Sequence, residues 1–179
     1  MKNYEELWAK SVEFHGHECP GLAIGFRAAW EAMEILGEDG PAEDEEIVCV
    51  TENDACGVDA VQVLTGCTLG KGNLVYRPTG KMAFAFYSKN KNKKVRMVLK
   101  SWRNPERSRE ENQSHILEAP LEEVFDIKDP HYDFPEEARL FENRVCEECG
   151  ELSPEHTMRF QDKKIVCRDC FKEYSRGCS

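Results

Sequence analysis

Four cysteines near the C-terminus constrain the fold more than any other feature of the sequence. They form two C-x₂-C pairs with 17 residues between the pairs: Cys146, Cys149, Cys167 and Cys170. Two tight turns with this spacing each offer two thiolates at tetrahedral angles around one ion, which is typical of a Cys₄ zinc site. Since four thiolates leave no open position for a substrate, the sequence predicts a structural zinc ion in a small zinc ribbon.

The segment between the two cysteine pairs also fits a ribbon. Apolar residues on both sides of the polar turn QDKK predict a hairpin. Residues 144–179 carry seven basic and seven acidic residues. A neutral ribbon favours contact with protein over contact with nucleic acid.

Charge and hydropathy limit the partners of the whole chain. The net charge of −10 over 179 residues has the wrong sign for coating nucleic acid or an anionic membrane. No apolar run approaches the roughly 20 residues of a membrane span. The opening MKNYEELWAK lacks the profile of a secretory signal, so we expect a cytoplasmic protein. A reducing compartment directs close cysteine pairs toward metal binding or catalysis rather than disulfides.

Apolar spacing divides the N-terminal part into helices and strands. Three segments have helical spacing: 3–14, 20–36 and 58–64. Four segments have the apolar runs or alternation of strands: 47–52, 74–77, 82–87 and 95–99. Short polar turns join the last three strands, which predicts an antiparallel meander. Residues 101–125 are expected to be helical with breaks.

The predicted fold class is therefore α+β, with an antiparallel or mixed sheet packed against helices and a small C-terminal zinc ribbon. Two prolines in KDPHYDFPEE indicate a linker. We expect an α+β domain over residues 1–130, a linker or helix over 131–143, and the ribbon over 144–179.

A second cluster of metal-ligating residues lies in FHGHECPG. His15, His17 and Cys19 alternate, so in extended backbone their side chains can point the same way. Cys19 precedes the helix that starts at Pro20, and Cys56 precedes the helix over 58–64. A helix N-terminus stabilises a thiolate and lowers its pKa. We predict that His17, Cys19 and Cys56 bind a second zinc or iron ion that keeps one coordination position open. His15 is expected either to hydrogen-bond to one of these ligands or to face the substrate.

Other interpretations of this cluster stay open. Cys56, His17 and Asp54 are candidate catalytic residues, because a Cys–His pair can act as a nucleophile without metal and Asp54 as a general base. Asp54 or Asp59 could also be a ligand or could orient a histidine. Cys49, inside an apolar strand, is interpreted as a buried hydrophobe, whereas Cys67 is ambiguous.

One segment is strongly basic. Residues 89–109 contain nine basic residues and one acidic residue. Such a run either solvates a hairpin tip and a strand face or forms an anion-facing surface. The nearby loop GCTLGKGN does not match a Walker A motif, but Lys71 within it is a candidate for contact with a small anionic ligand or cofactor.

Three stretches, HGHECPGLAIGFRAAW, ENDACGVDAVQVLTGCTLGKGNL and CEECGEL with CRDC, resemble the FmdE family, which is named for a component of formylmethanofuran dehydrogenase. The resemblance covers residues 1–175 and implies an α+β domain with a C-terminal zinc ribbon, commonly a homodimer. His17, Cys19 and Cys56 match the N-terminal motif of the family, and the four C-terminal cysteines match its ribbon.

The resemblance also implies a metabolic context. It links the chain to the molybdenum- or tungsten-dependent enzyme that reduces CO₂ to a formyl group on methanofuran. The resemblance permits a role in one-carbon metabolism or in the maturation of molybdopterin enzymes.

Three classes of function remain open from the sequence. The first is a metal-binding accessory protein with a molybdenum- or tungsten-enzyme subunit as partner. The second is a metal- or Cys/His-dependent enzyme acting on a small anionic substrate, and the third is an interaction subunit with structural zinc alone. We also expect a homodimer, because a chain of this size is not expected to bury all of Phe125, Phe134 and Phe141.

Overall fold

The sheet of the N-terminal unit has five strands in the order β2-β1-β3-β4-β5. In chain order they are β1 (Ile47–Thr51), β2 (Leu74–Tyr76), β3 (Ala83–Ser88), β4 (Lys93–Leu99) and β5 (Phe125–Lys128). The computed structural model describes residues 3–101, 103–135, 139–174 and 176–177. The chain divides into two units, residues 1–138 and 139–179. The sheet is mixed and packs against helices, which confirms the predicted α+β class.

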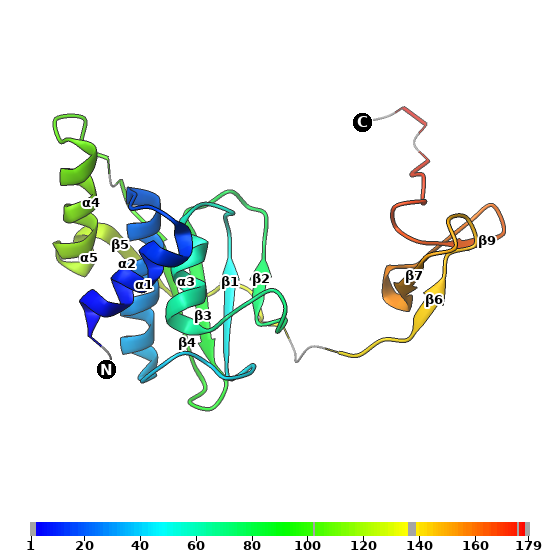
Figure 1. The fold of residues 1–179 in the computed structure, drawn as a ribbon, viewed down its shortest axis with the longest axis horizontal. Coiled ribbons are helices and arrows are strands. Elements are labelled where there is room, and N and C mark those ends of the chain that lie inside the picture. Colours follow the sequence, from blue (N-terminus) through cyan, green and yellow to red (C-terminus); the bar gives the residue numbers. More distant parts are fainter. Residues whose placement is uncertain (1–2, 102, 136–138, 175, 178–179) are drawn as a thin grey trace. The chain divides into compact units, whose positions relative to one another are not determined.

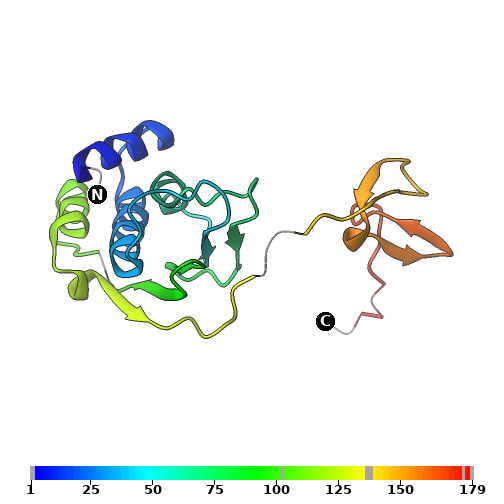
Figure 2. The same ribbon diagram turned by 90° about the horizontal axis from the view of Figure 1, so that it is seen from below.

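Helices pack on one face of this sheet (Figures 1 and 2). They are α1 (Tyr4–His15), α2 (Pro20–Leu36), α3 (Gly57–Thr65), α4 (Arg109–Glu118) and the single turn α5 (Leu121–Val124). The longest, α2, begins with Pro20 in its first turn and ends at Gly37, whose φ of 77° suits a residue without a Cβ. Its mostly buried side chains make α2 the central helix of the unit.

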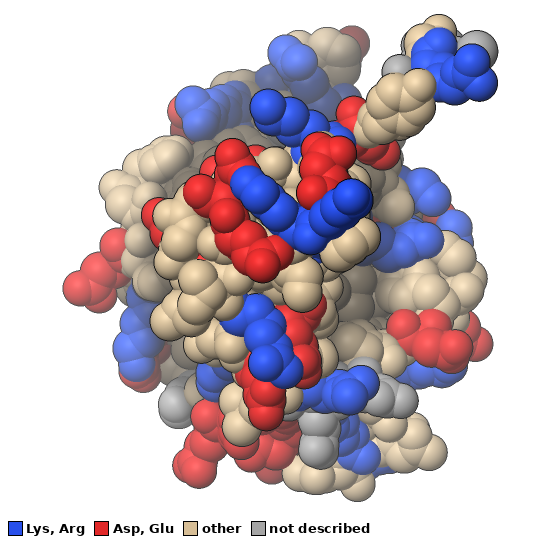
Figure 3. Space-filling view, turned by 90° about the vertical axis from the view of Figure 1, so that its right-hand side faces the viewer, with Lys and Arg blue, Asp and Glu red and all other residues tan. Residues whose placement is uncertain are grey.

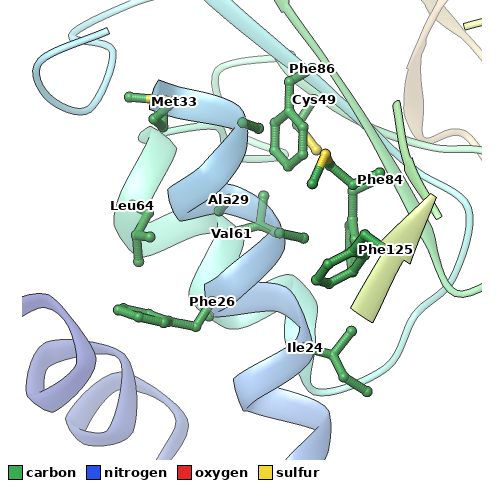
Figure 4. Packing of buried hydrophobic residues seen from close by; sticks show 14 of the residues in the cluster. Ile24, Phe26, Ala29, Met33, Cys49, Val61, Leu64, Phe84, Phe86 and Phe125 are labelled. Carbon is green, nitrogen blue, oxygen red and sulfur yellow. The ribbon is translucent and has the colours of Figure 1, made fainter. Parts of the chain in front are cut away.

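Aromatic side chains fill the space between α2 and the sheet. Phe84 and Phe86 of β3 and Phe125 of β5 are almost fully buried, and Figure 4 shows all three turned toward α2. Burying each such side chain contributes about 1.5–3 kcal/mol. Behind α2, Phe26 packs edge-on against Tyr4 and Trp8 of α1, with ring centroids 4.9 and 5.2 Å away.

The predicted antiparallel meander is wrong for its first strand. β2 pairs with β1 in parallel, with Cys49 opposite Leu74, and β1 separates β2 from β3. The reason is that α3 lies between β1 and β2 in the chain and provides the long crossover that parallel strands need. Only β3 and β4 form the predicted antiparallel hairpin.

The predicted broken helix is found as α4 and α5, which end at Glu118 and Val124, but its last residue begins a strand instead. Phe125 starts β5, which pairs antiparallel with β4 and places Phe125 opposite Leu99. This fifth strand buries the Phe125 ring, so the expectation that Phe125 is left over for a dimer contact is wrong. Phe134 stacks on Tyr87 at 5.2 Å and Phe141 on His156 at 4.0 Å, both within the chain.

The C-terminal unit consists of two small hairpins. β6 (Asn143–Val145) pairs with β7 (Leu152–Pro154), and β8 (Arg159–Gln161) pairs with β9 (Lys164–Val166), with a 3₁₀ turn over Glu155–Thr157. The second is the predicted hairpin. Its turn residues Asp162 and Lys163 have φ of 50° and 66°, as a two-residue type I′ turn requires.

The start of the predicted linker lies against the N-terminal unit. Tyr132 donates its hydroxyl to Glu52 at 3.1 Å, and the guanidinium of Arg77 lies 4.6 Å from the centre of the Tyr132 ring. Residues 136–138 of the predicted linker lie outside the described residues. Residues 131–135 therefore act as part of the N-terminal unit rather than as a free tether.

Charges of both signs lie on the face of the molecule that Figure 3 shows. On the face shown in Figure 3, Lys and Arg lie among Asp and Glu without a large field of either sign. Ion pairs such as Lys164–Glu148 at 2.8 Å and Arg144–Glu142 at 2.9 Å account for part of this mixture. Across the part of the chain that the structure describes, no helix has the length and apolarity needed to span a membrane.

Candidate metal centres

The four C-terminal cysteines converge on one point. One sulfur atom from each of Cys146, Cys149, Cys167 and Cys170 lies within 4.8 Å of the other three. The two C-x₂-C turns build this arrangement in the same way: the N–H of Gly150 donates to the carbonyl of Cys146 at 2.9 Å, and that of Phe171 to Cys167 at 3.0 Å. Four convergent soft donors fit a tetrahedral ion such as zinc.

Backbone amides favour the thiolate at one of the four ribbon cysteines, Cys146, whereas the hydrogen bond to Cys167 raises the pKa of the Cys170 thiol. The N–H of Cys167 donates to the sulfur of Cys146 at 3.2 Å. Hydrogen bonds from the backbone of Cys149 and Cys167 lower the pKa of the Cys146 thiol to about 6. Because the thiolate is the form that binds metal, these amides favour the liganding state near neutral pH.

The N-terminal cluster is built where α1 ends and α2 begins. His15 is the last residue of α1, and Gly16 turns the chain with a φ of 91°. Cys19 is the N-cap of α2, and its sulfur accepts a hydrogen bond from the N–H of Leu22 at 3.3 Å. One ligand atom each of His15, His17 and Cys19 lies within 4.8 Å of the other two.

A close approach of α2 and α3 carries Cys56 to this cluster. A Cβ added to Gly25 of α2 would lie 1.9 Å from the carbonyl oxygen of Gly57 in α3. A Cβ on Gly21 would lie 3.5 Å from the sulfur of Cys56 and 3.8 Å from that of Cys19. The helices therefore touch backbone to backbone because glycines face each other, and Cys56 lies beside Cys19 but outside the three-residue set.

His15 is held in the orientation of a metal ligand. Its Nδ1 lies 2.7 Å from Oδ2 of Asp59 on α3, and its Nε2 lies 3.8 Å from the sulfur of Cys19. Donation of the Nδ1 proton to the carboxylate leaves the lone pair of Nε2 facing the thiol, and a carboxylate is a usual partner for the second nitrogen of a metal-bound histidine. His17, which is exposed, lies next to His15 with ring centroids 4.5 Å apart.

The environment of Cys56 differs from the sequence-based expectation. Burial and the neighbouring Cys19 raise the pKa of the Cys56 thiol above its usual value. The side chain of Cys56, at the N-cap of α3, makes no capping hydrogen bond, and the backbone N–H of Cys56 itself lowers the pKa by less than burial and Cys19 raise it. A bound cation would favour the thiolate at this position.

Two cavities flank the cluster and share Cys56 in their walls. One has a volume of about 480 Å³, and its lining includes His15, Asp54, Asp59 and Tyr76. The other has a volume of about 440 Å³ and is lined by Cys19, Pro20, Gly21, Cys56, Arg103, Arg107, Arg109 and Asn112. Both volumes fall in the range of about 300–1,000 Å³ that small-molecule sites occupy.

The remaining sequence candidates lie elsewhere. Cys49 and Cys67 are fully buried in the core, and burial raises the pKa of Cys67 to about 11. The ammonium of Lys71 donates to the carbonyl oxygens of Ala42 at 2.9 Å and Glu43 at 3.5 Å. Lys71 therefore ties two loops together, and its contact with an anionic ligand stays a prediction.

Sequence reasoning does not assign several residues of the second cavity to this site. Arg103, Arg107 and Arg109 belong to the basic segment, whose place in the fold the sequence does not reveal. Asn112 gives no signal of its own. The spacing of Gly21 and Gly25, by contrast, is a readable sign of close helix packing, since residues four apart share a helix face.

Comparisons with known proteins agree with this architecture. The chain is 34% identical to a probable S-adenosyl-L-methionine-binding protein of Archaeoglobus fulgidus over 94% of its own length, but it spans only 53% of that relative. A solved structure of an FmdE-like protein of the tungsten formylmethanofuran dehydrogenase type, from Syntrophus aciditrophicus, superimposes with a TM-score of 0.68 at 26% identity, covering 93% of this chain and 91% of that one.

A family model described as "FmdE, Molybdenum formylmethanofuran dehydrogenase operon" matches residues 14–129. This range contains both cysteines of the N-terminal cluster, His15 and His17, and all five strands of the sheet. The predicted family resemblance is confirmed, and the chain belongs to the FmdE family.

Proposed function

We propose that the protein is a metal-binding accessory protein of the FmdE type, acting in one-carbon metabolism with a molybdenum or tungsten enzyme. A structural zinc ion binds to the four ribbon cysteines, and a second zinc or iron ion binds in the N-terminal unit. His15, His17 and Cys19 hold the second ion, with Cys56 as an adjacent thiolate. His15 thus joins the ligands inferred from the sequence, His17, Cys19 and Cys56.

The hydrogen bond between His15 and Asp59 carries this proposal. A histidine used only for packing has no need of a carboxylate on Nδ1 with Nε2 facing a thiol 3.8 Å away. Soft and borderline donors of this kind select zinc or iron over magnesium and calcium, which prefer oxygen ligands. Three ligands leave the fourth position of a tetrahedral ion open.

Metal analysis of the full chain tests the proposal. We expect two ions per chain in the wild type and one in Cys19→Ser. Cys67→Ser is the matched control, because it also removes a buried thiol but its hydroxyl can keep the hydrogen bond to the carbonyl of Ile47. One ion in the wild type, or two in Cys19→Ser, would refute the second site.

The cavities also favour a second candidate function, a metal- or Cys/His-dependent enzyme. Asp54 lines the larger cavity together with Cys56 and His15, so a candidate general base, a thiol and an imidazole line one cavity. The name of the Archaeoglobus relative suggests S-adenosyl-L-methionine as a ligand to test, by calorimetry on the metal-loaded chain. An enzyme turns over a substrate and loses that activity in Cys56→Ala, whereas an interaction subunit tolerates the change in a complementation assay.

Co-purification tests the role in metabolism. The protein isolated from its native cells is expected to carry subunits of a molybdenum or tungsten enzyme. If residues 1–138 alone also co-purify with the enzyme, the contact belongs to the N-terminal unit. If the full chain does not co-purify with such an enzyme, the accessory role is refuted.

A further inference from the structure

We propose that the cavity over Cys19 and Cys56 binds a small phosphate-bearing anion through Arg103, Arg107 and Arg109. This inference deepens the proposed function and rests on it, since it names the ligand class of the same site. The cavity of about 440 Å³ has the two cysteines and the three arginines among the residues that line it.

The three arginines differ from the other arginines of the N-terminal unit in their partners. Arg27 lies 2.7 Å from Glu31, Arg96 lies 2.6 Å from Glu52, and Arg77 lies 3.9 Å from the same carboxylate. Among the described residues, no carboxylate lies within 4.0 Å of the guanidinium groups that line the cavity. Three of the six arginines of residues 1–138 thus have no carboxylate partner among the described residues, and all three line one cavity.

The loop that carries these arginines is rigidly built. The buried amide of Asn112 donates to the carbonyl oxygens of Asn104, Arg107 and Ser108 at 3.2, 3.1 and 2.8 Å. Its oxygen accepts from the N–H of Asn104 at 3.0 Å. Asn112 therefore uses its hydrogen-bonding capacity to fix the backbone of residues 104–108 and leaves the guanidinium groups free for a ligand.

A capping box joins this loop to α4, and one hydrogen bond between side chains joins α4 to the turn before Cys19. Ser108 caps α4 and forms a capping box with Glu111, which sets the direction in which Arg109 leaves the loop. The side chain of Gln113 donates to Glu18 at 3.1 Å, one residue before Cys19. The arginine loop and the turn that carries Cys19 are thus connected, so an anion on the arginines lies next to the metal ligands.

Phosphate suits this arrangement better than other partners. A guanidinium is a planar fork that binds phosphate oxygens in pairs, and three of them can surround one phosphate group. The chain as a whole carries a net charge of −10, so an anion is attracted only where basic side chains gather, as three arginines do at this cavity. Nucleic acid would need a broad basic surface, whereas a concave site of this size fits a small molecule.

Calorimetric titration of the metal-loaded full chain with inorganic phosphate at low ionic strength tests the proposal. The variant R103Q/R107Q removes two positive charges from the cavity. The matched control K93Q/K94Q removes two exposed charges of the same basic segment at the start of β4. Charge-assisted hydrogen bonds predict a loss of affinity of at least about tenfold for each arginine, and less than about threefold for the control.

Phosphate binding to the wild type that is lost only in R103Q/R107Q supports the site. No binding to the wild type, or equal weakening in both variants, overturns it. If R103Q/R107Q does not fold, R109Q alone provides the same comparison. Metal content measured on the same samples separates the two claims: a chain that binds phosphate but lacks the N-terminal ion supports the anion site and refutes the proposed metal centre.

Discussion

The two units of this protein differ in how their cysteines are placed relative to the hydrophobic core. In the N-terminal unit, aromatic and aliphatic side chains around α2 form a core, and Cys19 and Cys56 sit at its rim. In the C-terminal unit, the described buried cluster consists of Cys146, Val166 and Cys167. The proposed metal of the first unit would bind to a site that the fold has already built, whereas the proposed metal of the second would itself hold the fold together.

The largest expected effect is loss of the ribbon metal. Cys167→Ser removes one of four thiolates from a unit with almost no apolar core, and structural zinc in such units contributes on the order of 10 kcal/mol. We expect zinc content to fall by one ion per chain and the resonances of β6–β9 to collapse, while those of β1–β5 persist. An unchanged zinc content would show that the four cysteines do not form the centre.

The next effect concerns a buried ion pair in the N-terminal unit. Glu52 is fully buried and accepts hydrogen bonds from Arg96, Thr79 and Tyr132. Burial by itself raises the pKa of Glu52, but these hydrogen bonds outweigh it and lower the pKa from 4.5 to about 2. Glu52→Gln leaves the Arg96 charge without a partner and is expected to cost about 3–5 kcal/mol in the free energy of unfolding.

The pH dependence gives this prediction a sign. Because the folded-state pKa of Glu52 is depressed, its contribution to stability is present above about pH 4.5 and is lost as the pH falls toward 2. The stability difference between wild type and Glu52→Gln, measured by urea titration, should therefore shrink over that range. Glu45→Gln, which breaks a partly exposed pair with Lys89, is the control and should change stability by less than about 1 kcal/mol.

The close contact between Gly25 of α2 and Gly57 of α3 positions the N-terminal cluster. Gly25→Ala places a methyl group against the carbonyl of Gly57 and must push the helices apart. We expect a loss of about 1–3 kcal/mol of stability together with weaker metal binding by the N-terminal unit. Gly40→Ala, where an added Cβ meets nothing within 4 Å, is the matched control. Wild-type metal affinity in a destabilised Gly25→Ala chain would separate the helix contact from the site.

The smallest effect is expected from the carboxylate behind His15. Asp59→Asn removes the acceptor that orients the ring and should weaken the N-terminal metal by about 10–100-fold, with zinc in the ribbon unchanged. Competition with a chromophoric chelator measures both affinities. Asp54→Asn removes a carboxylate from the same cavity without a hydrogen bond to His15, and its affinity should equal that of the wild type.

Local patterns in the sequence are sufficient for the ribbon hairpin and for the individual helices. The C-x₂-C spacing brings four cysteines together within one short segment, and Pro20, Gly37 and Gly66 mark helix ends by backbone geometry alone. Strand order is beyond these patterns, because an apolar strand does not specify its neighbour. The prediction for β2 is wrong for that reason.

The N-terminal site is predictable only in part, because some of its contacts join residues that are far apart in the sequence. Alternation in HGHEC indicates a cluster, and Asp59 is a candidate for orienting a histidine. Which histidine it orients depends on how α1 packs against α3, and that contact joins residues 44 positions apart. The arginine loop depends in the same way on Asn112, whose four hydrogen bonds form only once α4 is in place.

Hydrogen exchange of the full chain before and after removal of metal by a chelator tests the contrast between the units most directly. We expect amides of β6 to β9 to lose protection when metal is removed, while amides of β1 and β3, buried against α2, keep theirs. Readdition of zinc should restore the ribbon amides. Loss of protection in both units together, or a ribbon that stays protected without metal, would contradict the claim that the fold builds one site and the metal builds the other.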